Sequence, residues 1–455
     1  MITSYKYAGK KYRFISKDKK NDIDNIYTVI VGKNGSGKSR LLSSIVSTLL
    51  GRTKYDMRLG NEIDFRETAR AKIEVTNNHS KIITVSTSPF DRFPLNKKSG
   101  YNEDYIYLGL RDLAGTNFSL SYMAKITASL ISVVAYDSRH MDNLSQVLAY
   151  LGYNDRITIK LEQRLSTEMT NGLSAFEDPS EALEFLFSKT KYTNPLNKKY
   201  FFEQDGSPNS DRVYRLFSIL GRIPLPLKKE FITIEVDRHG VTQQPGLFNL
   251  HPEDISFLID CGAIRLRDLI LYNIRHQNSY SITNASSGEQ SVVMSLLGLA
   301  SQIKDGAIVC IDEPEICLHP EWQEKYIQLL IATFRHYKGC HFLIATHSPQ
   351  IISRLESRDC YVMSMDSGKA ISAKSLINNS ADFQLAKVFN HPGFKNEYLS
   401  RIGLNILTKV SRNKLFDSED LGHYNLIETQ SEFLEDNDPV LILFNVLREM
   451  KQHYA

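Results

Sequence analysis

The chain has 455 residues, a formal net charge of +3 at pH 7 and 42% hydrophobic residues, which suits a globular protein of two or three domains. The near-neutral charge gives no overall case for nucleic-acid binding, although it leaves room for a local basic patch. The five cysteines show no CxxC pair, which favours free thiols in a reducing cytoplasm. The N-terminus lacks the apolar core of a signal peptide, and no uncharged apolar run reaches the ~20 residues of a membrane span, so we expect a cytoplasmic protein without membrane contact.

The first part of the chain predicts an α/β unit. Residues 5–16 are aromatic-rich and partly alternating, as in a strand or hairpin, and residues 26–31 form the short apolar run of a buried parallel strand. Further elements are expected as a helix over 40–50, strands over 72–75 and 81–86, and a helix over 119–151.

The middle of the chain is more polar. Residues 154–222 carry helical stretches without sustained heptads, which predicts a compact helical insertion rather than a coiled coil. A strand over 231–236 follows.

The last part of the chain returns to α/β patterning. A loop and an apolar helix are expected over 286–302, and a hairpin over 360–373. Apolar strands at 307–311 and 342–345 flank a helix at 321–336, an order that fits a right-handed parallel crossover. The tail from 382 to 455 has a mostly helical, polar pattern, and its acids are expected to form a solvated surface.

A glycine-rich loop follows the first apolar strand and precedes a helix. Its GxxxxGK[ST] pattern consists of Gly32, Lys33, Asn34, Gly35, Ser36, Gly37, Lys38 and Ser39. Backbone N–H groups of such a loop point at phosphate oxygens, and the helix N-terminus adds positive potential. We therefore expect Lys38 to reach the β- and γ-phosphates of ATP, and the Ser39 hydroxyl to hold Mg²⁺.

Two acids and a histidine close two later strands. Asp312 can hold Mg²⁺, and Glu313 next to it is placed to polarise the attacking water. His347 ends the following strand, where it can bond to the γ-phosphate of ATP. The sequence thus predicts Glu313 and His347 as catalytic residues and Asp312 as a metal ligand.

A second anion-binding element lies at Ser287, Gly288, Glu289 and Gln290, where a serine and a glycine open a helix. One chain already has a phosphate loop for its own ATP. We therefore expect this element to bind the γ-phosphate held by a second chain, in a head-to-tail dimer or higher even oligomer.

In chain order, the motifs are the glycine-rich loop, the element at Ser287 to Gln290, Asp312-Glu313 and His347. Together they resemble the ABC-type ATPases, particularly the soluble branch with the SMC and recombination-repair proteins. The run Glu313-Pro314-Glu315-x-x-Leu318-His319-Pro320 looks like OLD-type and phage-defence ATPases. The resemblance covers about 1–135 and 226–365. It implies that Leu318 and His319 lie at the dimer seam.

Within this branch, residues 88–93 and 105–111 are similar to the ATPase of Septu systems and of some retrons, called PtuA. That likeness implies antiviral defence beside an HNH-type nuclease subunit, with contact to DNA or a retron nucleic acid. Composition and spacing do not themselves indicate this role.

The chain departs from the ABC pattern in three ways. No glutamine occurs between Ser39 and Leu130 to contact Mg²⁺, so Asp91 is either a substitute metal ligand or a turn residue. Glu289 stands where glycine is usual. The middle block is too short for an SMC arm and too long for a transporter insert.

The fold expected is therefore an ABC-type P-loop ATPase head with a helical insertion and a helical C-terminal tail. Its parts are predicted at 1–135, 136–225, 226–365 and 366–455, the last as a candidate for partner binding. The expected function is slow, Mg²⁺-dependent ATP hydrolysis that switches a nuclease partner. A DNA-repair ATPase and an ATP-gated binding module with little turnover stay open as alternatives.

Overall fold

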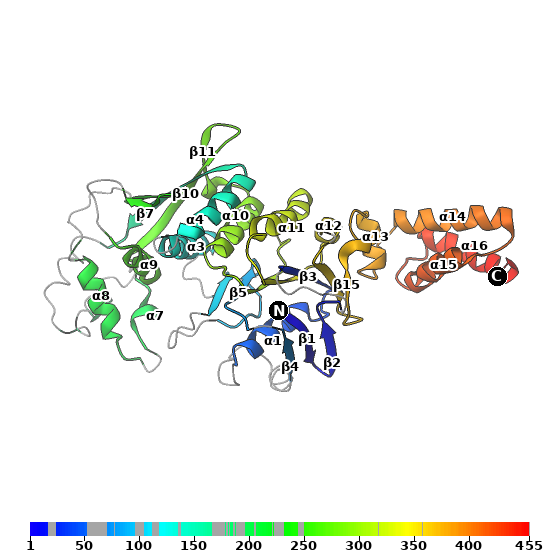
Figure 1. Cartoon of the computed structure of the whole chain (residues 1–455), viewed down its shortest axis with the longest axis horizontal. Helices are drawn as coiled ribbons and strands as arrows, with labels where there is room; N and C mark the ends of the chain where they lie inside the picture. The colour runs from blue at the N-terminus through cyan, green and yellow to red at the C-terminus, as the bar shows by residue number, and fades with distance from the viewer. Residues whose placement is uncertain are drawn as a thin grey trace.

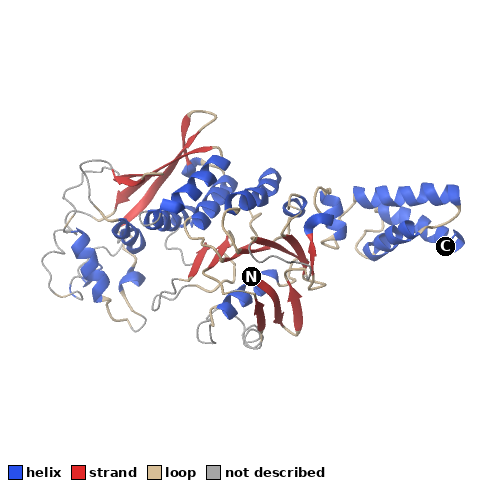
Figure 2. Ribbon diagram, in the orientation of Figure 1, coloured by secondary structure: helices blue, strands red, loops and turns tan. Residues whose placement is uncertain are grey.

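The computed structural model describes most of the chain. The described residues are 1–16, 24–51, 71–76, 78–95, 104–111, 118–134, 138–165, 178, 181, 183–184, 187, 196–203, 206–220, 222, 232–243, 250–316, 318–356 and 358–454. The molecule is elongated, with a central sheet, a second sheet towards one end and a helical arm at the other (Figures 1 and 2).

A seven-stranded sheet forms the centre of the α/β fold. Its order is β15-β14-β3-β13-β12-β5-β6, and every neighbouring pair is parallel except β14 with β15. The strands are β3 (Ile26–Val31), β5 (Ile82–Ser86), β6 (Tyr105–Gly109), β12 (Ile308–Asp312), β13 (His341–Ala345), β14 (Cys360–Ser364) and β15 (Ala370–Ser372). Because β3, β12 and β13 are parallel neighbours, the residues after all three meet at one edge of the sheet.

The two faces of this sheet support separate apolar cores. Ile30 and Cys310 face one core, which includes α1 (Lys38–Leu49) and the small antiparallel sheet β2-β1-β4, while Val29 and Ile311 face the other. The small sheet consists of β1 (Ile2–Tyr7), β2 (Lys10–Arg13) and β4 (Lys72–Val75). The alternation follows from the two-residue period of a strand that is buried on both faces.

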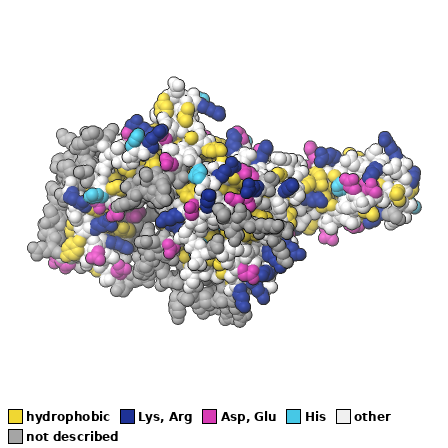
Figure 3. Space-filling model, in the orientation of Figure 1, with side chains coloured by type: hydrophobic (Ala, Val, Ile, Leu, Met, Phe, Trp, Pro, Cys, Tyr) yellow, Lys and Arg dark blue, Asp and Glu magenta, His cyan; other side chains and the backbone are white. Residues whose placement is uncertain are grey.

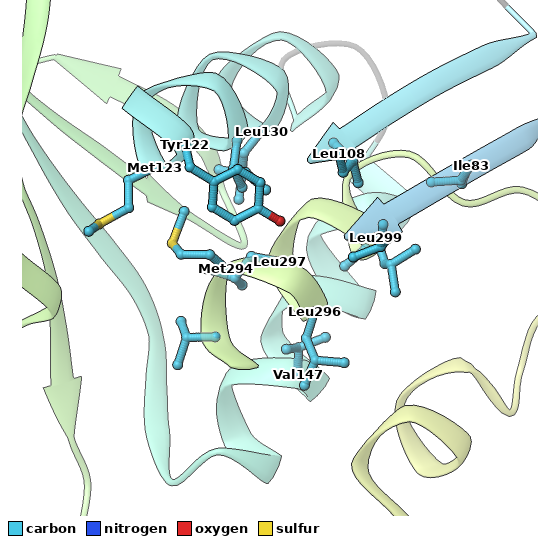
Figure 4. Packing of buried hydrophobic residues seen from close by; sticks show 14 of the residues in the cluster. Ile83, Leu108, Tyr122, Met123, Leu130, Val147, Met294, Leu296, Leu297 and Leu299 are labelled. Atoms are coloured by element: carbon cyan, nitrogen blue, oxygen red, sulfur yellow. The ribbon is translucent and has the colours of Figure 1, made fainter. Parts of the chain in front are cut away.

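Helix α10 (Ser287–Ala300) lies inside the larger core. It contacts α3 (Phe118–Val134), α4 (Ser138–Tyr150) and α11 (Pro320–Phe334). Figure 4 shows this packing, in which apolar residues from several elements surround one helix. The labelled residues are Ile83, Leu108, Tyr122, Met123, Leu130, Val147, Met294, Leu296, Leu297 and Leu299.

A second, antiparallel sheet corrects the prediction of a helical insertion over 136–225. Its order is β11-β10-β7-β8-β9, and its longest strand, β7 (Tyr153–Gln163), lies within the range expected to be helical. The other strands are β8 (Ile232–Asp237), β9 (Gly240–Gln243), β10 (Ile264–Asn273) and β11 (Asn278–Ser281). Long-range pairing of β7 with β8 and β10 outweighs its polar composition.

Helices accompany this second sheet, as the sequence partly predicted. They are α7 (Lys198–Phe201), α8 (Ser210–Leu220) and α9 (Pro252–Cys261). The single helix expected over 119–151 is two helices, α3 and α4, and residues 135–137 between them lie outside the described part of the chain.

The C-terminal arm confirms the expected helical tail. It contains α13 (Ala381–Lys387), α14 (Glu397–Asn413), α15 (Ser418–Ser431) and α16 (Pro439–Tyr454), and the last three share an apolar core. Two of its acids are not solvated as expected, because Asp420 and Asp438 are buried. Their carboxylates accept backbone N–H groups from Asp417 and Val440, respectively.

The remaining described elements are short. They are α12 (Pro349–Ser353) and the 3-10 helices η2 (Ile282–Asn284) and η3 (Ala373–Ser375). The four described cysteines, Cys261, Cys310, Cys340 and Cys360, are buried free thiols, and Cys317 lies outside the described residues. On the face that Figure 3 shows, acidic and basic side chains of the described residues lie interspersed.

Candidate nucleotide-binding site

The glycine-rich loop connects β3 to α1, as the sequence predicted. Gly35 and Gly37 have φ angles of 78° and 93°, and Gly37 is the N-cap of α1. Residues other than glycine rarely adopt this left-handed backbone conformation. The loop therefore directs the N-terminus of α1 towards the edge where β3, β12 and β13 end.

The residues of the loop form a cradle that fits a phosphate group. A Cβ atom on Gly32 would lie 2.7 Å from Ser36 Oγ and 2.9 Å from the Met365 side chain. The Ser36 hydroxyl oxygen is buried without a hydrogen-bond partner in the described structure. A buried hydroxyl without a partner at an anion-binding helix N-terminus suits a phosphate oxygen.

Lys38 and His347 meet beneath the loop. Lys38 Nζ donates to the Gly32 carbonyl at 3.1 Å and lies 2.5 Å from Nε2 of His347. Burial lowers the pKa of Lys38, while the carboxylates of Glu313, Glu315 and Asp312 oppose that shift. Burial, and then the charge of Lys38, lower the pKa of His347. A neutral imidazole can therefore accept the hydrogen bond that Lys38 donates.

Ser39 and Asp312 place two side-chain oxygen atoms next to each other. Ser39 Oγ donates to Asp312 Oδ1 at 3.0 Å, and Asp312 is buried at the end of β12. Burial raises the pKa of Asp312 to about 7, with smaller increases from Glu313 and Asp91. Hard oxygen donors of this kind fit Mg²⁺, which needs few protein ligands because phosphate and water supply the rest. The described residues include no cluster of three or more His, Cys, Asp or Glu suited to a metal.

Glu313 has an unusual backbone conformation at the next position. Its φ is 49°, and its N–H donates to the Ala345 carbonyl at 2.9 Å while its own carbonyl accepts the Thr87 hydroxyl at 3.1 Å. Its carboxylate Oε1 lies 3.4 Å from Nε2 of His347. A left-handed non-glycine residue held by two neighbouring strands is typical of functional sites.

Glu315 is a site residue to which the sequence analysis gave no role. The residue is partly exposed, and its Oε1 accepts the backbone N–H of His347 at 2.5 Å. Its other carboxylate oxygen is buried without a hydrogen-bond partner in the described structure, and burial raises its pKa. Glu315 thus fixes the backbone that carries His347. The signal was its place in the motif after Asp312, two residues beyond Glu313.

Asp91 lies near the site, but its carboxylate already has partners. Oδ2 accepts the Tyr107 hydroxyl at 2.6 Å, and Oδ1 lies 3.0 Å from the Arg111 guanidinium. Oδ1 also accepts the N–H of Phe93 at 3.0 Å, as in a turn. These contacts favour the turn interpretation of Asp91, while its role as a metal ligand stays a prediction.

The second anion-binding element forms the first turn of α10. Ser286 is the N-cap and accepts the Glu289 N–H at 3.3 Å, and Glu289 Oε2 accepts the Ser286 N–H at 3.0 Å in a capping box. Glu289 Oε2 also accepts the Tyr280 hydroxyl at 3.1 Å. Glu289 thus has a structural task in this turn, beside Ser287 and Gly288. A site shared with a second chain stays a prediction.

Gln290 orients the segment that leads into α10. Its side-chain amide donates to the carbonyls of Thr283 and Ala285 at 3.3 and 3.1 Å. In the neighbouring motif, His319 is the N-cap of α11 and Leu318 is buried.

Two aromatic side chains near the N-terminus, Tyr12 and Phe14, are buried in the apolar core that includes α1. By contrast, the helical arm touches the phosphate loop directly, because Lys33 Nζ lies 3.8 Å from the centroid of the Phe433 ring.

The sequence profile of one protein family matches residues 27–353, which is more than half of the chain. This family is described as "AAA domain, putative AbiEii toxin, Type IV TA system". The chain belongs to this family. The match spans the phosphate loop, the first turn of α10, Asp312, Glu313 and His347.

Two curated relatives of this AAA-domain protein are each named as the probable ATPase of a retron. It is 24% identical over 373 residues to the "Retron Ec83 probable ATPase" of Escherichia coli, covering 74% of this chain and 66% of the relative. It is 23% identical over 398 residues to the "Retron Vc95 probable ATPase" of Vibrio cholerae serotype O1 biovar El Tor, covering 80% and 72%. The chain thus spans just under two thirds of the E. coli relative's length.

Solved structures similar to the AAA-domain protein include two SMC head domains. The head bound to the C-winged helix domain of ScpA is 14% identical, with a TM-score of 0.30, over 82% of this chain and 97% of that chain. The Pyrococcus furiosus head with an extended coiled coil, bound to the C-terminal domain of ScpA, is 13% identical over the same shares, with a TM-score of 0.31. Because these TM-scores are low, we assign the fold from the sheet order and the motifs of the chain itself.

No helix in the described part of the AAA-domain protein combines the length and the apolar character that crossing a bilayer requires.

Proposed function

We propose that this protein binds ATP with Mg²⁺ and hydrolyses it slowly to ADP and phosphate. The observation that carries the proposal is the meeting of Lys38, Ser39, Asp312, Glu313 and His347 at one sheet edge. Ser39 Oγ lies 3.0 Å from Asp312, and His347 Nε2 lies within 3.4 Å of both Lys38 Nζ and Glu313. These groups come from three different segments of the chain.

Each residue has a distinct task in this proposal. The phosphate loop and Lys38 bind the triphosphate, and Ser39 and Asp312 hold Mg²⁺, which neutralises phosphate charge when bound. Glu313 orients and polarises the attacking water. Without nucleotide, His347 accepts a hydrogen bond from Lys38. When ATP is bound, the imidazole gives up that partner and donates an N–H to the γ-phosphate.

The same exchange makes the protein a switch. In the proposed head-to-tail dimer, Ser287 and Gly288 of one chain complete the ATP site of the other, so γ-phosphate closes the seam and its loss opens it. The retron relatives support a role beside a retron and its nucleic acid. The motif likeness to PtuA supports antiviral defence in the cytoplasm with an HNH-type nuclease subunit.

Hydrolysis is tested with Glu313→Gln and Lys38→Ala. We expect Glu313→Gln to bind ATP normally but to hydrolyse it about 10²- to 10⁴-fold more slowly, because the group that polarises water is lost. Lys38→Ala should lose ATP binding itself. Phosphate release and equilibrium dialysis with labelled ATP measure the two quantities.

The matched control is Glu324→Gln, which alters an exposed glutamate of α11 that pairs with Arg354. It should leave both quantities unchanged. Full hydrolysis by Glu313→Gln would reject the proposed role of Glu313. Full biological function of that variant without hydrolysis would instead favour the ATP-gated binding module.

The partner proposal is tested separately by purification from cells that carry the neighbouring genes. A stable complex with a nuclease subunit is expected. Recovery of a lone dimer with and without ATP would reject that partner.

A further inference from the structure

Successive residues of β7 from Arg156 onwards point alternately to the buried face and to the outward face of the sheet. Ile157, Ile159 and Leu161 are buried, whereas the even-numbered residues between Arg156 and Arg164 point to the other side of the sheet. Three of those five even positions are basic, namely Arg156, Lys160 and Arg164. At about 3.3 Å per residue, they span roughly 26 Å.

Two arginines of the neighbouring strand strengthen one end of this face. Arg265 and Arg267 both pair with Glu162, at 2.6 and 2.7 Å, and each has about 45% of its side chain exposed. Arg164 continues the ladder beside them, since its N–H donates to the Ala263 carbonyl. Partial burial and the charges of Arg265 and Arg267 lower the pKa of Arg164. Three guanidinium groups and one carboxylate leave a local charge of about +2 by simple addition.

The rest of the face is closer to neutral. Arg156 pairs with Glu235, and Lys160 lies opposite Asp268 in the β7–β10 register. The excess positive charge is therefore concentrated around Glu162. Exposed arginines in excess of acids favour bidentate contact with phosphate groups.

This face is connected to the proposed γ-phosphate element. β10 leads through a hairpin to β11, η2 and α10, and Asp268 of β10 accepts the hydroxyls of Ser281 and Thr283 at 2.7 and 3.0 Å. Tyr280 of β11 contacts Glu289 of the capping box. A polyanion on the sheet would thus lie one hairpin away from the first turn of α10.

We propose that the outward face of β7 and β10 binds the sugar–phosphate backbone of a nucleic-acid strand, with Arg164, Arg265 and Arg267 as the main contacts. The inference deepens the proposed function by assigning nucleic-acid contact to a specific surface. Binding through phosphates is weakly dependent on sequence and strongly dependent on salt.

The test measures anisotropy of labelled 20-nucleotide single-stranded DNA, and RNA of the same sequence, with the full-length protein between 50 and 200 mM salt. Neutralising two phosphate contacts in Arg265→Gln/Arg267→Gln should reduce the slope of log affinity against log salt by about 1.4 and weaken binding on the order of tenfold. Glu162→Gln should tighten binding, because it removes the carboxylate that lies among Arg164, Arg265 and Arg267.

These two variants break the same ion pairs, so a merely structural role would move both affinities in the same direction. Arg354→Gln/Arg358→Gln removes two exposed arginines elsewhere, each paired with an acid, and should bind like the wild type. Preference for RNA or DNA identifies the natural strand.

Equal affinity of the Arg265→Gln/Arg267→Gln protein and the wild type would overturn the inference, as would tighter binding of polyglutamate than of either oligonucleotide. ATP hydrolysis is measured on the same samples. A wild-type protein that hydrolyses ATP but binds neither oligonucleotide would reject the sheet-face inference alone, whereas a wild-type protein that does not bind ATP would reject the proposed function.

Discussion

At the scale of single residues, the contacts of Asp91 favour a structural role for this residue over a role as a metal ligand. Its carboxylate is fully buried and faces the Arg111 guanidinium, which is 17% exposed. The Tyr107 hydroxyl donates to the Asp91 carboxylate. Burial, and then the charge of that carboxylate, raise the pKa of Tyr107. A buried carboxylate with a cation and two hydrogen bonds is satisfied without Mg²⁺.

We therefore expect Asp91→Asn to lower the free energy of unfolding by about 1–3 kcal/mol, because charge-assisted hydrogen bonds are weakened. The Mg²⁺ concentration for half-maximal hydrolysis should not change. Asp312→Asn should raise that concentration and is the positive control. An equal rise in Asp91→Asn would show that Asp91 holds the metal after all.

At the scale of elements, close packing of α10 depends on one glycine. A Cβ atom on Gly298 would lie 2.6 Å from the Ile126 side chain of α3 and 3.2 Å from that of Leu108. Gly422 of α15 has nothing within 4 Å of such an atom. The two helical glycines therefore offer opposite environments for the same methyl group.

Gly298→Ala should destabilise the protein by about 1–3 kcal/mol through overpacking. Gly422→Ala should stabilise it by roughly 0.5–1 kcal/mol, because alanine loses less conformational entropy in a helix. Chemical denaturation measures both. Equal effects of the two substitutions would contradict the packing argument.

The N-terminus of α15 should give the arm a measurable acid sensitivity. Asp417 is the N-cap of α15. Its hydrogen bond with the Lys409 ammonium, and to a smaller extent the one from the Asp420 N–H, lowers the pKa of Asp417 to about 2. The pKa in the unfolded chain is about 3.9. Because the folded value is lower, the stabilisation is present above about pH 4 and is lost as the pH falls towards 2.

Asp417→Asn keeps a capping side chain but removes the titrating group. Its urea midpoint should therefore fall less between pH 5 and pH 2.5 than that of the wild type. Identical pH profiles would mean that Asp417 contributes nothing to the acid sensitivity.

At the scale of the whole molecule, the arm and the phosphate loop are in contact. Phe433, after α15, lies against Lys33 of the loop and stacks on His391, with ring centroids 6.0 Å apart. A cation–π contact at an exposed site is worth about 0.5–1 kcal/mol. Nucleotide binding and arm position should therefore influence each other reciprocally.

Phe433→Ala frees Lys33 for phosphate, so we expect ATP binding to tighten about two- to fivefold. Phe394→Ala is the control, because Phe394 is an exposed aromatic ring of the same arm that faces Lys395. Calorimetric titration with a non-hydrolysable ATP analogue measures the affinities. Unchanged affinity in Phe433→Ala would show that the contact carries no coupling.

The sequence alone determined the loop between β3 and α1, the strands that end at Asp312 and at Ala345, and the helical tail. These features depend on neighbours in the chain: glycines permit left-handed turns, and short apolar runs form buried strands. The same local chemistry predicted the residues of the candidate ATP site. It also contained an overlooked signal for β7, the alternation of Ile157, Ile159 and Leu161 with polar residues.

Only the tertiary structure decided which distant residues meet. It paired β7 with β8 and β10, gave Asp91 its partners Tyr107 and Arg111, and placed Glu315 beneath His347. It also brought Phe433 to Lys33 across 400 positions of sequence. Such contacts depend on how whole elements pack, because the free energy of burying and pairing groups is shared among segments that no local pattern relates.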